Sequence, residues 1–588
     1  MVSADRLEEL ALEHGFQDIT TLGKILKDLR QGAVIGCTGK FRGPTKASNA
    51  PSAFMDGRKV TDAICSWIHS GFCYGPVDIA DVPATGKFSG IMTRPKPNGS
   101  VRIILNLSAP EHCSVNKGID ASEFPTVMSS TTKWLVALNR AGRNCLMVKH
   151  DWAEAYKHVA VALEDTDLQY FTWLGKAFKE LCLIFGGKSS AGIFDRLAKV
   201  VLFVVRVKSG MPEEQTCQHL DDCVAAGSPG KPEIFAFDEA FFEVAHYLGV
   251  RLAPRDDPEK SFGPSTQGIV LGVHYDTVSW TWAIPGEKLL RLLHLLQLVL
   301  EAEEVTQDVF WTLNGKILHV KPLVAMGRFN INHLIKANSV SENRDALIPV
   351  SEDVKKQCWF WFTMLRVCSG RATIPDPTLG MPAWTLEVHT DAAGGSVTNR
   401  NLGAGVVCQG WWTRVPWSKA IHLAHQTPEG KRLDRAMSAL ELVGPLIFLA
   451  SNPDACRGRP VRVWVDNAGS VFIWKKGYST SCSLSTTLVR AIGTVASSLG
   501  CRFEIEKVTR CSEPLAVMAD ALSKADFAKF WAEAGQLGDL DLGSHPASIP
   551  GPIVAWIRNP RRDDELGDRL VEVIGRSGCV LTSQASSV

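Results

Sequence analysis

Two short apolar arms flank an acidic pair in the stretch Cys217-Gln218-His219-Leu220-Asp221-Asp222-Cys223-Val224-Ala225-Ala226-Gly227. This pattern predicts a β-hairpin with both carboxylates at its tip. A second stretch, Leu146-Met147-Val148-Lys149-His150-Asp151, is typical of a strand that ends in a carboxylate. We therefore expect Asp151 to meet Asp221 and Asp222 on one sheet. Clustered carboxylate oxygens suit a hard cation such as Mg²⁺, which keeps waters and substrate phosphates as its other ligands.

The segment before this strand is basic. Between Asp81 and His150 the chain has nine Lys or Arg residues against four acids, which favours a phosphate-facing surface. Within it, Ile91–Asn106 is predicted to form a β-hairpin that turns at Asn98-Gly99.

Length and composition limit the classes of protein that fit. At 588 residues the chain is expected to hold about four modules. With 45% hydrophobic and 21% charged residues it is typical of a folded globular protein. A net charge of +1 excludes an overall basic field. None of the 16 Cys residues forms a C-x2-C pair, which disfavours zinc fingers and zinc knuckles and predicts reduced thiols in an intracellular protein.

The sequence shows no targeting or membrane segment. The acidic start, Met1–Asp18, is unlike a signal or transit peptide. The longest apolar runs, Leu197–Val207 and Leu289–Leu300, are too short and too charged to span a bilayer. We therefore expect no membrane partner.

The second half of the chain changes pattern after the Pro-rich stretch Ile374–Trp384, which we interpret as a linker. A strand-rich segment is expected over Trp384–Val415, with a further strand over Val461–Val465. Apolar spacing predicts helices over Glu287–Glu301, Leu433–Ser451 and Glu513–Phe527. The polar segment Gly535–Val588 is expected to be a loosely packed tail.

Four further acids lie in this half. Asp391 and Asp466 each end a predicted strand, whereas Glu441 and Asp520 lie in apolar helical segments. A carboxylate on an apolar helix face is costly to bury unless it binds a metal or a partner. Taken singly, each acid is also compatible with an ordinary surface charge.

The surroundings of the first acids resemble known motifs. Lys149–Tyr156 resembles motif A of reverse transcriptases, in which an aromatic residue follows the Asp five positions later, and His219–Asp222 resembles their motif C. Leu183–Gly192 resembles motif B. Lys96 and the stretch Val101–Ser108 resemble the fingers motif that grips the incoming triphosphate.

The likeness continues downstream, where Leu248–Val250 and Gly268–Gly272 resemble the last palm motifs, and it spans roughly residues 85–335. The tyrosine-recombinase retrotransposons of the DIRS group are the most similar family, and gypsy-like elements are more distantly similar. In motif B, Ile184 and Gly192 each stand where the family usually has Pro. Motif C opens with His219 in place of Tyr. None of these changes removes a metal ligand.

The four later acids, in the order Asp, Glu, Asp, Asp, resemble the ribonuclease H active site, over about residues 383–530. Arg510 stands where many ribonucleases H carry a mobile His that helps product to leave. Arg contacts phosphate but does not shuttle a proton near neutral pH, so turnover is expected to be affected more than the metal chemistry.

These resemblances imply an α/β multidomain fold, a right-hand polymerase followed by a ribonuclease H-like domain. The expected parts are an N-terminal extension (1–84), fingers and palm (85–275), thumb (276–335), connection (336–382), ribonuclease H (383–530) and tail (531–588). The implied activity is RNA-directed DNA synthesis with cleavage of the RNA strand of the hybrid, by two Mg²⁺ or Mn²⁺ ions per site. The implied partners are an RNA template, a DNA or RNA primer, an RNA–DNA hybrid and deoxynucleoside triphosphates.

The resemblance also assigns residues. The metal ligands and catalytic residues would be Asp151, Asp221, Asp222, Asp391, Glu441, Asp466 and Asp520, and the nucleotide site would contain Lys96, Arg102, Tyr156 and Gly186. Tyr156 would exclude a 2′-hydroxyl; its alternative role is that of a core aromatic.

Two other classes of protein remain open. A nucleic-acid-binding remnant of such an element would keep the fold without turnover, although all seven acids are present. The second alternative is a cellular hydrolase with scattered Asp clusters, but this class does not explain the order of the motifs.

Overall fold

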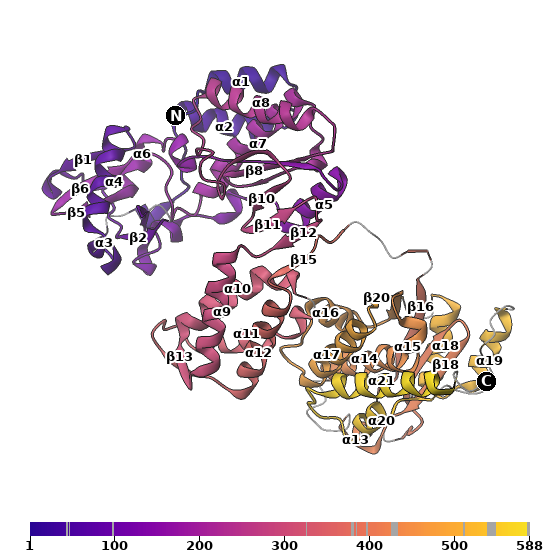
Figure 1. The fold of residues 1–588 in the computed structure, drawn as a ribbon. Helices are drawn as coiled ribbons and strands as arrows, with labels where there is room; N and C mark the ends of the chain where they lie inside the picture. The colour runs from indigo at the N-terminus through magenta and orange to yellow at the C-terminus, as the bar shows by residue number, and fades with distance from the viewer. Residues whose placement is uncertain are drawn as a thin grey trace. The chain divides into compact units, whose positions relative to one another are not determined.

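The computed structural model describes residues 1–42, 45, 47–96, 99–324, 326–377, 382–383, 385–394, 398–424, 433–509, 512–537, 542 and 548–584. They form two compact units, which Figure 1 traces in colour along the chain. Unit 1 comprises Met1–Pro285 with Thr373–Thr378, and unit 2 comprises Gly286–Ala372 with Leu379–Val588. Both units mix helices and strands, as the α/β expectation required.

Unit 1 is built around a four-stranded antiparallel sheet in the order β7-β8-β4-β9. The strands are β4 (Leu146–Asp151), β7 (Thr216–His219), β8 (Asp222–Gly227) and β9 (Phe262–Ser265). The helices α5 (Thr131–Ala141), α7 (Ser190–Ser209) and α8 (Glu233–Leu248) pack against its strands or against each other. The predicted strand over 146–151 and the predicted acidic hairpin over 217–227 are confirmed.

A smaller sheet and a hairpin accompany this sheet. The hairpin predicted over Ile91–Asn106 is confirmed as β2 (Ile91–Pro95) and β3 (Val101–Leu105), although Asn98 lies outside the described residues. The sheet has the order β1-β6-β5, from β1 (Cys73–Val77), β5 (Tyr170–Trp173) and β6 (Lys176–Glu180). Unit 1 also contains α3 (Pro51–Met55), α6 (Leu163–Thr166), β10 (Gln267–Val270), β11 (Val273–Asp276) and β12 (Thr281–Ala283).

The N-terminal segment is part of the core of unit 1. Helices α1 (Ala4–Glu13), α2 (Ile19–Gln31) and α4 (Gly57–His69) are amphipathic, and Leu7, Ile25 and Ile64 are almost fully buried in the same hydrophobic cluster as α7 and α8. Burial of each such side chain contributes about 1.5–3 kcal/mol, so this segment stabilises the unit that contains β4 and β8.

Unit 2 begins with a helical subregion. It contains α9 (Gly286–Glu301), α10 (Gln307–Val320), α11 (Asn332–Ala337) and α12 (Glu352–Val367), with the strand pair β13 (Glu304–Thr306) and β14 (Leu347–Pro349). The amphipathic helix predicted over Glu287–Glu301 is confirmed as α9, whose residues Leu292, Leu296 and Val299 are buried. The short strand β15 (Arg371–Thr373) follows α12.

The remainder of unit 2 holds a five-stranded mixed sheet in the order β18-β17-β16-β19-β20. The strands are β16 (Leu386–Ala392), β17 (Gly403–Cys408), β18 (Trp411–Pro416), β19 (Pro460–Val465) and β20 (Arg502–Lys507). β16 pairs parallel with β19 and antiparallel with β17, and β19 pairs parallel with β20. The helices are α13 (Lys419–Ala424), α14 (Leu433–Ser451), α15 (Pro453–Cys456), α16 (Ala468–Lys476), α17 (Ser483–Ser498), α18 (Pro514–Ser523) and α19 (Phe527–Gln536).

The helix predicted over Glu513–Phe527 is confirmed as α18, but it ends four residues earlier, and a second helix begins at Phe527. α18 ends at Ser523, and Ala525 has a left-handed φ of 61° that breaks the helical path. The Asp526 side chain then accepts a hydrogen bond from the Lys529 N–H and caps α19. By contrast, the strand-rich segment, the strand over Val461–Val465 and the helix over Leu433–Ser451 are confirmed.

The expectation of a loosely packed C-terminal segment is wrong for its described part. α20 (Gly551–Arg558) buries Ile553 and Trp556, and α21 (Leu566–Gln584) buries Leu566 and Leu570, in the same core as α14 and α17. The composition is polar, but the apolar residues repeat at helical spacing, which composition alone does not reveal.

Candidate active sites

The hairpin β7–β8 places its acidic pair beside the end of β4. Asp151 lies directly opposite Asp222 in the antiparallel register of β4 and β8. Asp221 occupies the turn between β7 and β8, where Leu220 adopts a left-handed φ of 53°. The Trp152 N–H donates to the Asp221 carbonyl at 3.1 Å, which holds the turn against the chain that leaves β4. The three acids are therefore brought to one end of the sheet, as the sequence predicted.

The charges of these acids act on one another. Burial, together with the charges of Asp151 and Asp222, raises the pKa of Asp221 to about 6, against the opposing effect of Arg102. Burial also raises the pKa of Asp151, against the opposing effect of Lys260. A site that holds carboxylates together against their repulsion is suited to binding a cation.

Two lysines that the sequence reasoning missed neutralise this site. The Lys260 ammonium lies 2.9 Å from Asp151 Oδ2, and the buried Lys149 ammonium lies 3.1 Å from Asp222 Oδ1. Lys149 lies two residues before Asp151, so both side chains share one face of β4. The spacing of two residues along a strand could therefore have predicted that Lys149 lies beside the acids. Lys260 lies in a loop, where no such spacing applies.

Three of the four predicted nucleotide-binding residues lie beside Phe185, namely Arg102, Tyr156 and Gly186. The Tyr156 ring lies 4.8 Å from the Phe185 ring, and the Arg102 guanidinium lies 4.5 Å from the centre of that ring. Gly186 has a φ of 104°, and a Cβ there would lie 2.1 Å from the Leu105 carbonyl oxygen, so only glycine fits. Gly186 thereby brings the loop after Phe185 against the β2–β3 hairpin.

Tyr156 is affected by a carboxylate of the site, and Lys96 by the cations beside it. Burial lowers the pKa of Lys96, and the charges of Arg102 and Lys260 lower it further. Burial raises the pKa of Tyr156 to about 12, with Asp221 acting in the same direction. The Tyr156 ring is half-buried and also packs at 5.9 Å against Phe194 of α7.

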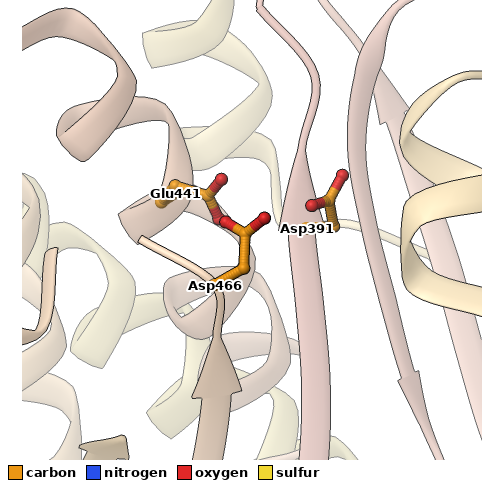
Figure 2. A group of neighbouring side chains, drawn as sticks. All are labelled: Asp391, Glu441 and Asp466. Atoms are coloured by element: carbon orange, nitrogen blue, oxygen red, sulfur yellow. The ribbon is translucent and has the colours of Figure 1, made fainter. Parts of the chain in front are cut away.

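Unit 2 contains a tighter carboxylate group. Asp391, Glu441 and Asp466 each present a carboxylate oxygen within 4.8 Å of the others. Figure 2 shows that they come from three elements: Asp391 from β16, Glu441 from the facing helix α14, and Asp466 from the residue after β19. Asp391 and Glu441 are only 5% and 2% exposed. In the described part of the chain, this is the one group of three acidic, His or Cys side chains that meets this distance.

Two glycines allow the helices to approach the strands that carry this group. A Cβ on Gly444, one turn after Glu441, would lie 2.7 Å from Thr390 Cβ on β16. A Cβ on Gly405, which lies opposite Asp391 on β17, would lie 2.4 Å from the Ala519 carbonyl oxygen of α18. The close approach of α14 to β16 brings Glu441 to the site, and the close approach of α18 to β17 brings Asp520 to it.

Asp520 borders the same site without joining the three-residue group. It lines a small cavity together with Asp391, Asp466, His389 and Trp464. The Lys524 ammonium lies 2.5 Å from Asp520 Oδ1, one turn further along α18. Arg510, which the resemblance placed near this acid, lies outside the described residues.

The sequence reasoning missed two polar contacts between β16 and α18. The Ser523 hydroxyl lies 2.6 Å from Asp391 Oδ2. His389 Nε2 lies 3.0 Å from Glu513 Oε2, at the residue that precedes α18. Neither contact is visible in the sequence, because the partners lie more than 100 positions apart.

The predicted ligands of both sites are all carboxylates, the donor type that Mg²⁺ and Mn²⁺ prefer and that soft metals do not. The residues therefore fit hard divalent cations. In the described part of the chain, no helix is both long and apolar enough to cross a membrane.

Comparisons with known proteins give structural likeness only. No family model matches the chain, and no curated protein matches it. The dRH form of the foamy viral protease-reverse transcriptase in complex with double-stranded DNA is 13% identical, covering 87% of this chain and 82% of that chain at a TM-score of 0.44. The same viral protein in complex with an RNA/DNA hybrid is 14% identical, covering 87% of this chain and 63% of that chain at a TM-score of 0.45. At such values the likeness carries no weight, and the assignment of function rests on the two carboxylate sites.

Proposed function

We propose that the chain is an RNA-directed DNA polymerase joined to a ribonuclease H, from a retroelement similar to the DIRS group. The observation that carries the proposal is the presence of two separate carboxylate sites, one in each compact unit. The acids of each site come from the residues that the motif order selects. A remnant without function would not be expected to keep both sites assembled at a cost to stability.

In unit 1, Asp151, Asp221 and Asp222 would hold two divalent cations. When bound, these cations would favour the deprotonated form of a primer 3′-hydroxyl and balance charge on the triphosphate. Lys96 and Arg102 would bind triphosphate oxygens. The charge of Arg102 acts on Asp221, and Lys96 in turn lies within range of the charges of Arg102 and Lys260. Tyr156 would pack under the deoxyribose, and Gly186 would let the backbone approach the nucleotide.

In unit 2, Asp391, Glu441 and Asp466, with Asp520 at the border, would hold the cations that serve hydrolysis of the RNA strand. The same oxygen-only donor set suits a water nucleophile and a phosphodiester. The mixed sheet supports this proposal, because parallel pairing of β16 and β19 brings the ends of both strands, and therefore Asp391 and Asp466, to one edge.

The domain assignments follow from the same proposal. Fingers and palm would occupy 85–275, the thumb 276–335, the connection 336–382 and the ribonuclease H 383–530. Residues 1–84 and 531–588 would flank them. The template, primer, hybrid and deoxynucleoside triphosphates are proposed partners and substrates.

The test is extension of an oligo(dT) primer on poly(rA) with Mg²⁺ or Mn²⁺, alongside cleavage of a labelled RNA strand in a hybrid. The wild type should perform both reactions. Asp221→Asn should reduce extension by orders of magnitude and retain cleavage. Extension that survives Asp221→Asn, or a wild type inactive in both assays, would reject the proposal.

A further inference from the structure

Ser523 is a buried serine on α18 whose hydroxyl faces the carboxylate group of unit 2. It is 0% exposed and lies three residues after Asp520. Its Oγ lies 2.6 Å from Asp391 Oδ2 and 2.8 Å from the Asp520 carbonyl oxygen. The hydroxyl therefore lies between the chain segments that carry two of the four acids.

A serine hydroxyl has one proton, so it donates to one of these two acceptors at a time. An ionised carboxylate only accepts, and O–H···O⁻ hydrogen bonds are typically about 2.5–2.7 Å long. The shorter contact, to Asp391, has the length of such a charge-assisted bond. Backbone carbonyls in helices commonly accept a second, weaker contact from a nearby serine, and this accounts for the longer distance to Asp520.

The position of Ser523 is fixed by packing. A Cβ on Gly405 would lie 2.6 Å from Leu522 Cβ and 2.9 Å from the Ser523 nitrogen, so β17 and the end of α18 are in direct contact. At the other end of α18, Glu513 meets His389 of β16 at 3.0 Å. Because α18 is held against the sheet at both ends, the backbone of Ser523 keeps a fixed place relative to Asp391.

We propose that Ser523 is a positioning residue for the metal site. Its hydroxyl holds the Asp391 carboxylate in the orientation in which it faces Glu441 and Asp466, and so increases the affinity of the group for a divalent cation. This inference rests on the proposed function of that group. Outer-shell partners of metal ligands commonly act in this way, and their loss costs about 10–100-fold in metal affinity.

The test is Mn²⁺ binding to the full chain, followed by the electron paramagnetic resonance signal of free Mn²⁺. All variants carry Asp221→Asn, so that binding in unit 1 is weakened equally. Ser523→Ala should bind Mn²⁺ about 10–100-fold more weakly at the unit 2 site. Ser523→Cys, which keeps a weak donor of similar size, should give an intermediate affinity.

A matched control is Ser485→Ala on α17. Ser485 is also 0% exposed, and its hydroxyl has no hydrogen-bond partner among the described atoms. This control should leave Mn²⁺ affinity unchanged while reporting the cost of removing a buried hydroxyl from the same unit. Melting temperatures of all variants accompany the titrations.

Unchanged Mn²⁺ affinity in Ser523→Ala, with or without a lower melting temperature, would overturn the inference and leave Ser523 a purely structural residue. If Ser523→Ala does not fold, the same criterion applies to Ser523→Cys. Asp391→Asn distinguishes failure of the role proposed for Ser523 from failure of the metal site itself. If that variant binds Mn²⁺ as tightly as its parent, the group is not a metal site and the proposed function of unit 2 fails as well.

Discussion

Replacing Asp221 by Asn should stabilise unit 1 while abolishing its activity. The pKa of Asp221 is raised from its ordinary value of 3.8 to about 6, mainly by burial and then by Asp151 and Asp222. At about 1.36 kcal/mol per pKa unit, this rise corresponds to about 3 kcal/mol. The figure is an upper bound on what the ionised carboxylate costs the folded state at neutral pH.

The pH dependence of the free energy of unfolding follows from proton linkage. Because the folded-state pKa lies above the unfolded-state value, the folded protein binds this proton more tightly. The resulting stability is complete below about pH 4 and is lost as the pH rises through about 6. Asn carries no charge at any pH, so Asp221→Asn should raise the free energy of unfolding at pH 7.5 and flatten its pH dependence between pH 4 and 6.

The assay is calorimetric unfolding in EDTA, at pH 4.5 and pH 7.5, with assignment of the transition that belongs to unit 1. The control is the neighbouring acid. Asp222→Asn should destabilise, by about 2 kcal/mol, because it leaves the buried Lys149 ammonium without its carboxylate partner. A lower unfolding temperature of Asp221→Asn at pH 7.5, or shifts of the same sign in both variants, would refute this reasoning.

Three further predictions follow from the geometry. Glu441→Gln should reduce cleavage of the RNA strand in a hybrid by at least about 100-fold and leave primer extension intact, because Glu441 belongs only to the unit 2 group; loss of extension in the folded variant would contradict this. Tyr156→Ala should raise ribonucleotide incorporation relative to deoxyribonucleotide incorporation in primer extension, whereas a core role predicts a lower melting temperature with unchanged discrimination. Gly405→Ala should lower the unfolding free energy of unit 2 by about 1–3 kcal/mol in denaturant titrations, since its Cβ would meet the Ala519 carbonyl oxygen at 2.4 Å. The control Gly535→Ala on α19, where a Cβ meets nothing within 4 Å, should be neutral or stabilising by about 0.5–1 kcal/mol; equal losses in both variants would argue against the close approach.

Local patterns predicted the elements whose ends carry the acids. Short apolar stretches predicted β4 and the β7–β8 hairpin, 3-4 spacing predicted α9, and a helix-like stretch predicted α14; the bounds of both helices agree to within one residue. These features depend on residues close in sequence. Helices α20 and α21 were missed because the polar composition of 535–588 outweighed a helical period that is present in Ile553, Trp556 and Ile557.

The partners of the acids could not be predicted in the same way. Lys260 reaches Asp151 from 109 positions away, and Ser523 reaches Asp391 from 132 positions away. Such contacts depend on how elements pack, and the residue types involved are common on surfaces. Motif spacing therefore selected the acids that the structure gathers in each unit, but not the side chains that contact them.

Each of the two sites holds several carboxylates close together. The side chains that contact these carboxylates differ between the two units. In unit 1, Lys260 and Lys149 supply positive charge directly to Asp151 and Asp222. In unit 2, Asp391 is met by the neutral Ser523 hydroxyl, and the ammonium of Lys524 pairs with Asp520 at the border of the site. Asp391, Glu441 and Asp466 also present carboxylate oxygens within 4.8 Å of one another, so a bound cation would relieve their mutual repulsion. Divalent cations should consequently raise the unfolding temperature of unit 2, and Asp391→Asn should remove that increase.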